Sequence, residues 1–222
     1  MKLIILRHAE SVKNTYKQFS SDKNNEILTD IGLGQVERVA SAIYDYVTRT
    51  DSKVRNVYCA ESMRAISTAQ IIADKLKAEI VPYSGLLSVT TDAQIKGKSE
   101  EEIKKVNPQF IHELELYRAG IFNAYNYTTV ADQIKSGKYE QQIAQVLEDI
   151  MENKNEDLKI IIMHHSSLTA SIIRFARIGH GYPIDFYGNI VADLGKIYVV
   201  ELNKDTCNIL HANKSPEILN LL

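Results

Sequence analysis

The chain has 222 residues, of which 45% are hydrophobic and 24% are charged. This composition excludes disordered and fibrous proteins, and the length suits one globular domain with a sizeable core. The formal net charge of −2 gives no basic excess, so we expect neither nucleic acid nor a membrane surface as a partner.

Cysteine usage and hydropathy indicate the cellular compartment. Cys59 and Cys207 are too few and too far apart in the sequence for a disulfide framework, which is typical of a reducing compartment. The first apolar run is interrupted by Arg7 and His8 before it reaches the length of a secretory signal. No apolar stretch reaches the roughly 20 residues of a membrane-spanning helix. We therefore expect a soluble, cytoplasmic protein.

Apolar runs alternate with amphipathic segments over the first third of the chain. Residues 2–6, 54–59 and 80–82 are expected to be strands. Residues 31–47 and 64–76 carry apolar side chains at helical spacing and are expected to be helices. This alternation predicts an α/β fold, a three-layer sandwich with a mostly parallel central sheet and helices on both faces.

The middle of the chain, at about residues 84–157, has little strand signal and is expected to be a helical insertion that caps the sheet. Within it, Ser99 and Glu102 have the spacing of a capping box, and Pro108 suits the first turn of a helix. A long helix is expected at about residues 139–152.

The last part of the chain returns to the pattern of strand and helix. Residues 159–163 predict a buried strand and residues 167–175 the helix that follows it. Residues 190–192 and 197–202 are expected to be the final strands. There is no internal repeat or low-complexity linker, so we expect a single domain over residues 1–222.

Three predicted strands end in residues suited to binding an anion. The first strand ends in Arg7 and His8, the second leads to Arg64, and the strand after the insertion is followed by His164 and His165. Ligands of parallel sheets bind outside the carboxyl ends of the strands. These side chains therefore predict an anion-binding site at one edge of the sheet.

The same residues have alternative, structural interpretations. His8 is then a hydrogen-bonded histidine at a sheet edge, and Arg64 extends to solvent from the first helical turn, where the helix dipole disfavours a cation by about 0.3–1 kcal/mol. Adjacent residues of a strand point to opposite faces, so His164 and His165 cannot both enter one pocket while the strand continues. That geometry disfavours a zinc site, which needs a spacing such as His-x-x-x-His on a helix.

Four segments occur in this order: "RHAE" at 7–10, "LTDIG" at 28–32, "YCAESMRAISTA" at 58–69 and "IIMHHSSLTA" at 161–170. Together they resemble the histidine phosphatase (phosphoglycerate mutase-like) superfamily. The segment "RHAE" at 7–10, followed by Asn14, is similar to Arg-His-Gly-Glu-x-x-x-Asn, with alanine in place of glycine. The segment "LTDIG" at 28–32 is similar to Leu-Thr-x-x-Gly, and "YCAESMRAISTA" at 58–69 is similar to Tyr-Ser-Ser-x-x-x-Arg-Ala-x-x-Thr-Ala. The segment "IIMHHSSLTA" at 161–170 is similar to the one that usually reads His-Gly-Gly after an apolar strand.

The resemblance implies a metal-independent phosphatase that hydrolyses a phosphomonoester, or a related phosphoryl compound, through a phosphohistidine on His8. It implies that Arg7 and Arg64 hold the phosphate oxygens, for which planar guanidinium groups are suited. It implies no metal and no cofactor. The implied partner is a small phosphorylated substrate or a phosphoprotein.

The resemblance also implies further contacts in the pocket. Aligning residues 166–167 with the family's glycine pair makes a protonated His165 the second catalytic histidine and puts His164 at a variable position. Asn14 and Ser166 are then substrate-binding residues, with loop capping and helix capping as their structural alternatives.

One part of the family pattern is missing. The proton donor is usually a glutamate after the third strand, and anchoring the segment on Gly97 puts Val89 at that position. Asp92 is the nearest carboxylic acid and is the candidate donor, with a solvated loop aspartate as the alternative. A positioned acid is worth about 100- to 10,000-fold, so its loss favours substrates with good leaving groups.

The sequence is also compatible with two other functions. One is a phosphoglycerate mutase-type phosphotransferase, which the missing glutamate disfavours. The other is a phosphate-ligand binding or regulatory module with little turnover. Keeping Arg7, His8, Arg64 and His165 together favours the enzyme, because binding alone requires no nucleophile.

Overall fold

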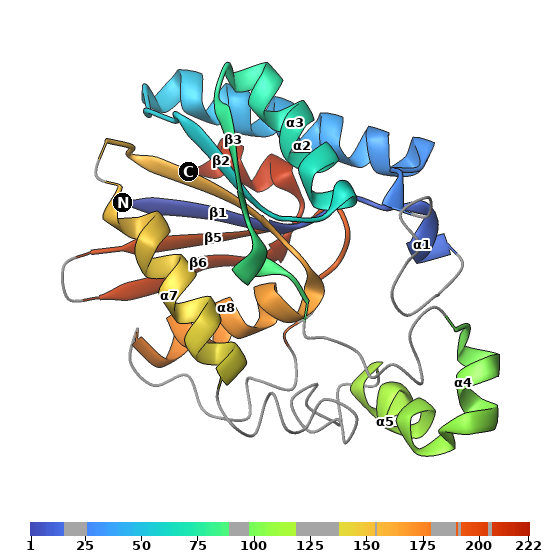
Figure 1. Ribbon diagram of the computed structural model, residues 1–222. Helices are drawn as coiled ribbons and strands as arrows, with labels where there is room; N and C mark the ends of the chain where they lie inside the picture. Colours follow the sequence, from blue (N-terminus) through green and yellow to red (C-terminus); the bar gives the residue numbers. More distant parts are fainter. Residues whose placement is uncertain are drawn as a thin grey trace.

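The computed structural model describes residues 1–15, 26–88, 98–118, 138–153, 155–178, 190, 192–203 and 206–222. Within these residues six strands form one sheet in the order β3-β2-β4-β1-β5-β6 (Figure 1). Their bounds are β1 Lys2–Arg7, β2 Asn56–Ala60, β3 Glu79–Tyr83, β4 Leu158–Met163, β5 Ile197–Leu202 and β6 Cys207–Lys214. Strands β3, β2, β4 and β1 run parallel, while β5 is antiparallel to both of its neighbours.

The central strands β1 and β4 determine where the site lies. Residues 3–6 and 160–162 are almost completely buried, as expected for parallel strands covered on both faces. The two strands end at the same level, because Arg7 is paired with Met163. Strand β2 also ends there, since Cys59 is paired with Ile162. The residues that follow these three strands therefore emerge together at one edge of the sheet.

Helices cover both faces of the sheet, which confirms the predicted three-layer α/β fold (Figure 1). On one face lie α2 (Asp30–Thr50) and α3 (Met63–Leu76), together with the short helix η5 (Pro216–Leu221). On the other face lie α7 (Lys138–Glu152) and α8 (His165–Ile178). None of the helices in the described segments is both long enough and apolar enough to cross a bilayer.

The predicted helical insertion has two different parts. Helices α4 (Glu100–Val106) and α5 (Pro108–Arg118) pack against each other beside the sheet (Figure 1), and the capping box of Ser99 and Glu102 is present at the start of α4. Helix α7 instead belongs to a layer of the sandwich, because its apolar face lies in the main hydrophobic core. Among the described residues of the insertion, α4 and α5 lie beside the sheet and α7 belongs to the sandwich, and the extent of the cap stays a prediction.

The prediction for the last strands is confirmed in part, because residues 197–202 form β5 as expected. Ile190 and Ala192, which were expected in a strand, lie outside any strand. The final strand is β6, Cys207–Lys214, which pairs with β5 at the edge of the sheet. Its residues are mostly half-buried and alternate only weakly between apolar and polar, so the periodicity that identifies a strand is faint.

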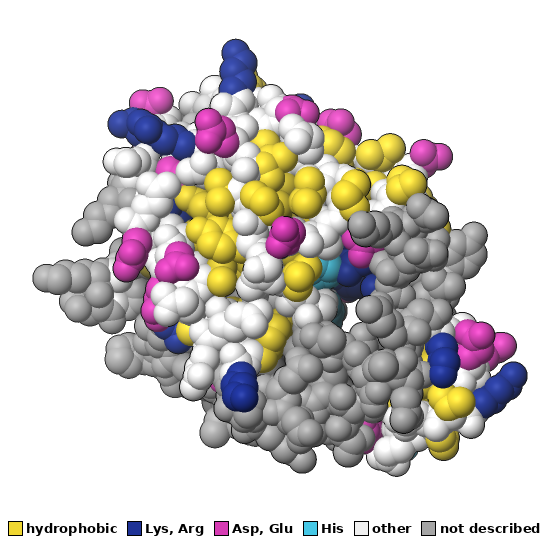
Figure 2. All heavy atoms as spheres, in the orientation of Figure 1, with side chains coloured by type: hydrophobic (Ala, Val, Ile, Leu, Met, Phe, Trp, Pro, Cys, Tyr) yellow, Lys and Arg dark blue, Asp and Glu magenta, His cyan; other side chains and the backbone are white. Residues whose placement is uncertain are grey.

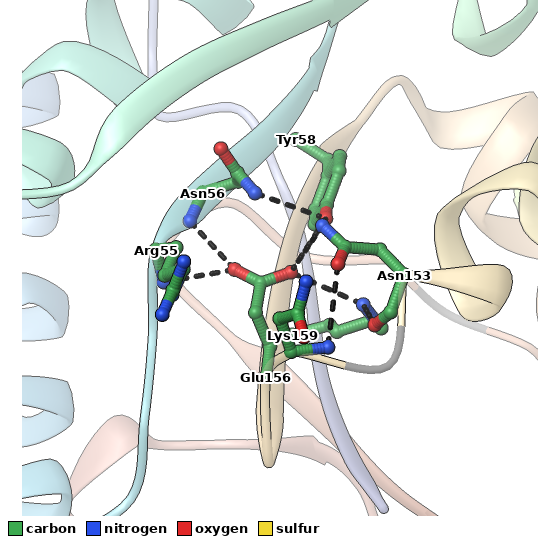
Figure 3. Close-up of polar contacts among 7 residues, drawn as sticks. Arg55, Asn56, Tyr58, Asn153, Glu156 and Lys159 are labelled. Atoms are coloured by element: carbon green, nitrogen blue, oxygen red, sulfur yellow. Dashed lines mark hydrogen bonds and ion pairs between the residues drawn. The ribbon is translucent and has the colours of Figure 1, made fainter.

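A buried polar cluster joins β2 to β4 at the other end of the sheet (Figure 3). Glu156 accepts hydrogen bonds from the backbone N–H groups of Arg55 and Asn56 at 2.8 and 2.6 Å, and from the Tyr58 hydroxyl at 2.6 Å. Lys159, which is fully buried, forms an ion pair with Glu156 at 3.1 Å. Burial alone would raise the pKa of Glu156, but these hydrogen bonds outweigh it and lower the pKa below its ordinary value.

We predict that Lys159→Met lowers the free energy of unfolding by roughly 3–5 kcal/mol, because it leaves the buried carboxylate without its cation. Urea denaturation measures this value. Lys75→Met, at an exposed position of α3, is the matched control and changes stability by no more than about 0.5 kcal/mol. Equal stability of the two variants would contradict the prediction.

Candidate active site

His8 follows β1 directly, and its side chain is only 2% exposed. Its Nε2 lies 3.0 Å from Nε of Arg64, and its Nδ1 lies 2.8 Å from the carbonyl oxygen of Ala9. A guanidinium group only donates hydrogen bonds, so Nε2 accepts and the ring proton is on Nδ1, which donates to Ala9. His8 is therefore neutral, with the lone pair of Nε2 directed into the site.

The two motifs at 7–10 and 28–32 hold this geometry by contacting each other. The Thr29 hydroxyl donates to the Glu10 carboxylate at 2.6 Å and caps α2 by accepting from the N–H of Gly32 at 3.0 Å. A Cβ atom at Gly32 would lie 2.0 Å from the Glu10 carbonyl oxygen, so only glycine allows this approach. Glu10 thus has a structural role behind His8.

Arg64 lies in the first turn of α3 and joins three parts of the chain. Besides His8, its guanidinium donates from Nη2 to Nδ1 of His164 at 2.7 Å. It also donates from Nη1 to Oε1 of Glu26 at 3.0 Å. Arg64 is only 6% exposed, and burial lowers its pKa while the charge of Glu26 raises it. The cation that local helix rules disfavour is thus held at the centre of the site.

His164 is the second histidine of this centre. Its Nδ1 accepts from Arg64, so its proton lies on Nε2, which donates to Oγ of Ser62 at 2.9 Å. The rings of His164 and His8 lie with their centroids 5.2 Å apart in an edge-on arrangement. The ends of β1 and β4 and the start of α3 therefore bring two imidazoles onto one guanidinium.

The resemblance implies His165 as the second catalytic histidine, whereas the contacts above place His164 beside Arg64 and His8. Strand β4 ends at Met163, and His165 is the first residue of α8. His164 occupies the turn between them, where its backbone N–H and carbonyl group both bond the Ser167 hydroxyl, at 3.0 and 3.1 Å. The alignment that favours His165 sets residues 166–167 on the family's glycine pair and so depends on where this strand ends, and the choice between the two histidines stays a prediction.

Arg7 adds a second buried guanidinium. Its Nη1 donates to the carbonyl oxygen of Ala192 at 3.1 Å, while its buried Nε has no hydrogen-bond partner within the described segments. Burial, together with the charge of Arg64, lowers the pKa of Arg7 to about 10. A buried cation with an unused donor fits an anionic ligand.

Lys13 is a further cation that the sequence analysis did not single out. The bridge between Ser11 and Leu28 places the short helix α1 (Val12–Thr15) alongside the segment that contains Glu26. Burial and the charge of Arg64 lower the pKa of Lys13 to about 8, and the charge of Glu26 opposes this shift. Because no motif includes Lys13, Glu26 or Ser62 in a catalytic role, only their positions in space reveal them.

The other predicted site residues have mixed outcomes. Asn14 uses Oδ1 locally, accepting from the Ser11 N–H at 2.9 Å and the Ser11 hydroxyl at 2.8 Å. The Ser166 hydroxyl lies 3.3 Å from that of Tyr139. Asp92 lies outside the described residues. Substrate contact by Asn14 and Ser166 and proton donation by Asp92 therefore stay predictions.

The three histidines that follow the strand ends, His8, His164 and His165, have lowered pKa values. For His8, burial is the main cause, followed by His164 and the two arginines. For His164, burial is again first, followed by Arg64 and Lys13. Burial and Arg7 lower the pKa of His165 to about 3. These shifts favour neutral imidazoles in the unliganded site, and a protonated His165 stays a prediction.

Figure 2 shows histidine atoms next to side chains of the Lys and Arg class in a recess of the surface. Two guanidinium groups, an ammonium group and neutral imidazoles form a pocket suited to a phosphate group and a nucleophile beside it. Among the described residues, no group of three or more His, Cys, Asp or Glu side chains could hold a metal ion.

Comparisons with known proteins agree with this geometry. The family model of the histidine phosphatase superfamily (branch 1) matches residues 3–215. A 2,3-bisphosphoglycerate-dependent phosphoglycerate mutase of Thermoplasma acidophilum is 23% identical over 176 residues, which cover 79% of this chain and 76% of the relative.

Solved structures share the fold. The alpha-ribazole phosphatase of Shigella flexneri superposes with a TM-score of 0.71 at 16% identity, covering 96% of both chains. The phosphoserine phosphatase of Entamoeba histolytica, in complex with 3-phosphoglyceric acid, superposes with a TM-score of 0.70 at 19% identity, covering 98% of both chains.

We predict that acid destabilises this protein through its buried neutral histidines. Because the folded pKa of His8 lies below its ordinary value of 6.5, the unfolded chain binds a proton that the folded chain does not, and stability falls as the pH drops below 6.5. The loss is roughly 1.4 kcal/mol per histidine between about pH 7.5 and about pH 5.5. His8→Asn removes the part of this loss of unfolding free energy that comes from His8. Urea denaturation at both pH values measures the difference.

His112→Asn is the control for that measurement, because His112 is exposed on α5. It should leave the pH dependence of stability as it is in the wild type. If His8→Asn also leaves the pH dependence unchanged, His8 is not held neutral in the folded protein.

Proposed function

Because the chain belongs to the histidine phosphatase superfamily, we propose that it hydrolyses a phosphomonoester through a phosphohistidine on His8. The observation that carries this proposal is the state of the His8 ring. Its Nδ1 proton is held by the Ala9 carbonyl group, and its Nε2 lone pair faces Arg64. A neutral imidazole fixed in this tautomer is ready to act as a nucleophile toward phosphorus.

The reaction has two displacements at phosphorus. In the first, the Nε2 lone pair of His8 forms the P–N bond while the ester P–O bond breaks, and the leaving oxygen takes a proton. In the second, water attacks phosphorus, the P–N bond breaks, and inorganic phosphate leaves. Arg7 and Arg64 hold the equatorial oxygens in both steps, where charge spreads in the transition state.

We assign the role of the second histidine to His164. Its contacts with Arg64 and His8 put it next to the place where the phosphoryl group must bind. A dianion bound there favours protonation of His164, because an opposite charge raises the pKa of an imidazole. Protonation at Nδ1 of His164 replaces the hydrogen bond from Nη2 of Arg64, so that both groups then donate to the phosphoryl oxygens. Asp92 remains the candidate proton donor to the leaving group.

The substrate that we propose is a small phosphorylated metabolite. Support comes from solved relatives that bind such compounds, including phosphoserine phosphatase with phosphoserine and with 3-phosphoglyceric acid. The second candidate function is a mutase, which is favoured by the similarity to the phosphoglycerate mutase of Thermoplasma acidophilum. A mutase returns the phosphoryl group of His8 to an acceptor alcohol instead of to water.

We predict that the protein releases phosphate from p-nitrophenyl phosphate in the presence of EDTA, and that His8→Asn lowers kcat by roughly 10,000-fold or more because the nucleophile is lost. Steady-state assays measure this, with circular dichroism to confirm that the variant is folded. Phosphate binding without turnover in the wild type would favour a binding module. Interconversion of phosphoglycerates that exceeds phosphate release would favour the mutase.

We also predict different effects of the two adjacent histidines. His164→Ala lowers kcat/KM for p-nitrophenyl phosphate by about 100- to 1,000-fold, the usual effect of removing one donor to a developing charge. The matched variant His165→Ala has a much smaller effect. A larger loss in His165→Ala than in His164→Ala would show that the alignment of the sequence, and not the contact geometry, identifies the second histidine.

A further inference from the structure

Glu26 is a carboxylate inside a site built to bind an anion. It is half-buried, and its Oε1 accepts from Nη1 of Arg64 at 3.0 Å. Its Oε2 accepts from the backbone N–H of Met63, the first residue of α3, at 2.9 Å. One carboxylate therefore contacts both the key guanidinium and the amino end of the helix that carries it.

Glu26 takes over a role that Ser62 would otherwise have. Ser62 is the N-cap residue of α3, but its side chain makes no capping bond to the helix. The Ser62 hydroxyl accepts from His164 instead. Because free N–H groups at a helix start favour a negative charge, the Glu26 carboxylate completes the helix end while Ser62 holds the histidine.

The donor pattern of Arg64 shows what this contact does. Nε donates to His8 and Nη2 donates to His164, so these two nitrogens face the reacting groups. Nη1 is occupied by Glu26. Since a guanidinium group is planar and rigid, fixing Nη1 fixes the direction in which Nε and Nη2 point.

Charge supports the same role. The described cations around the site are Arg7, Arg64 and Lys13, and Glu26 is the carboxylate that interacts with Arg64 and Lys13. Glu26 offsets part of the positive charge of Arg64 and Lys13, and Asp193 interacts in the same way with Arg7. Without Glu26 the excess positive charge would hold product phosphate more tightly.

We propose that Glu26 is a positioning residue, which fixes the plane of the Arg64 guanidinium so that Nε and Nη2 face His8 and His164, and which limits how tightly the pocket holds phosphate. This role rests on the proposed function of the site. Glu26 is not our candidate for the missing proton donor, because both of its oxygens already accept hydrogen bonds within the protein.

The test compares Glu26→Ala and Glu26→Gln with the wild type, using p-nitrophenyl phosphate as substrate and inorganic phosphate as inhibitor. Glu26→Ala lowers kcat roughly 100-fold, the effect of a small misplacement of a catalytic group. Glu26→Gln lowers kcat by about tenfold or less, because its amide oxygen still accepts from Arg64. In Glu26→Gln inorganic phosphate inhibits about tenfold more strongly, because a like charge is gone.

Glu61→Gln is the matched control, because Glu61 is an exposed carboxylate on the loop just before α3. It removes the same charge, but Glu61 is not the residue that holds Nη1 of Arg64. In this variant kcat and phosphate inhibition stay within about twofold of the wild type. An equal effect of Glu61→Gln and Glu26→Gln would overturn the proposal, because general charge would then explain the result.

A second readout needs no turnover. Long-range proton–nitrogen NMR of the imidazoles reports the hydrogen bonds at His8 Nε2 and His164 Nδ1. Both signals shift in Glu26→Ala and keep their positions in Glu61→Gln. Unchanged signals in Glu26→Ala, or weaker phosphate binding in Glu26→Gln, overturn the proposal. If the wild-type protein has no phosphatase activity, the proposed function fails, while these signals and phosphate binding still decide the role of Glu26.

Discussion

The Arg64 guanidinium donates to His8, His164 and Glu26 at once, and the rest of the site depends on this sharing. Each bond determines a property of its partner: the Nε2 lone pair of His8, the tautomer of His164 and the position of the Glu26 carboxylate. All of them lie where burial makes an unpaired polar group costly. One cation therefore selects the chemical state of both imidazoles before a substrate arrives.

The sheet makes this sharing possible. Strands β1, β2 and β4 are adjacent and parallel, and they end at the same level, so residues far apart in the sequence meet without long loops. The Glu156–Lys159 pair joins β2 and β4 at their other end, where it contacts no residue of the pocket described above. The buried ion pair and the candidate active site thus lie at opposite ends of the same strands.

The sequence predicts the core strands from their continuous apolar runs. It also predicts the grouping of Arg7, His8 and Arg64 from the ordered motifs that contain them. Arg7, His8 and Arg64 come together as expected, since each follows a strand whose end the pattern locates. The choice between His164 and His165 requires the strand end to one residue, which periodicity does not resolve, so the sequence alone does not decide it. Glu26 and Ser62 were missed since their roles depend on contacts between distant segments, and β6 was missed because edge strands are only half-buried.

The central claim is that Nε2 of His8 takes the phosphoryl group from the substrate. Rapid quenching of a turnover reaction in alkali, with a radiolabelled phosphomonoester, tests it most directly. We predict a label that is stable in alkali, is lost in acid and lies on the peptide that contains His8. Turnover without any trapped label, or a label on His164 or His165, would contradict the account.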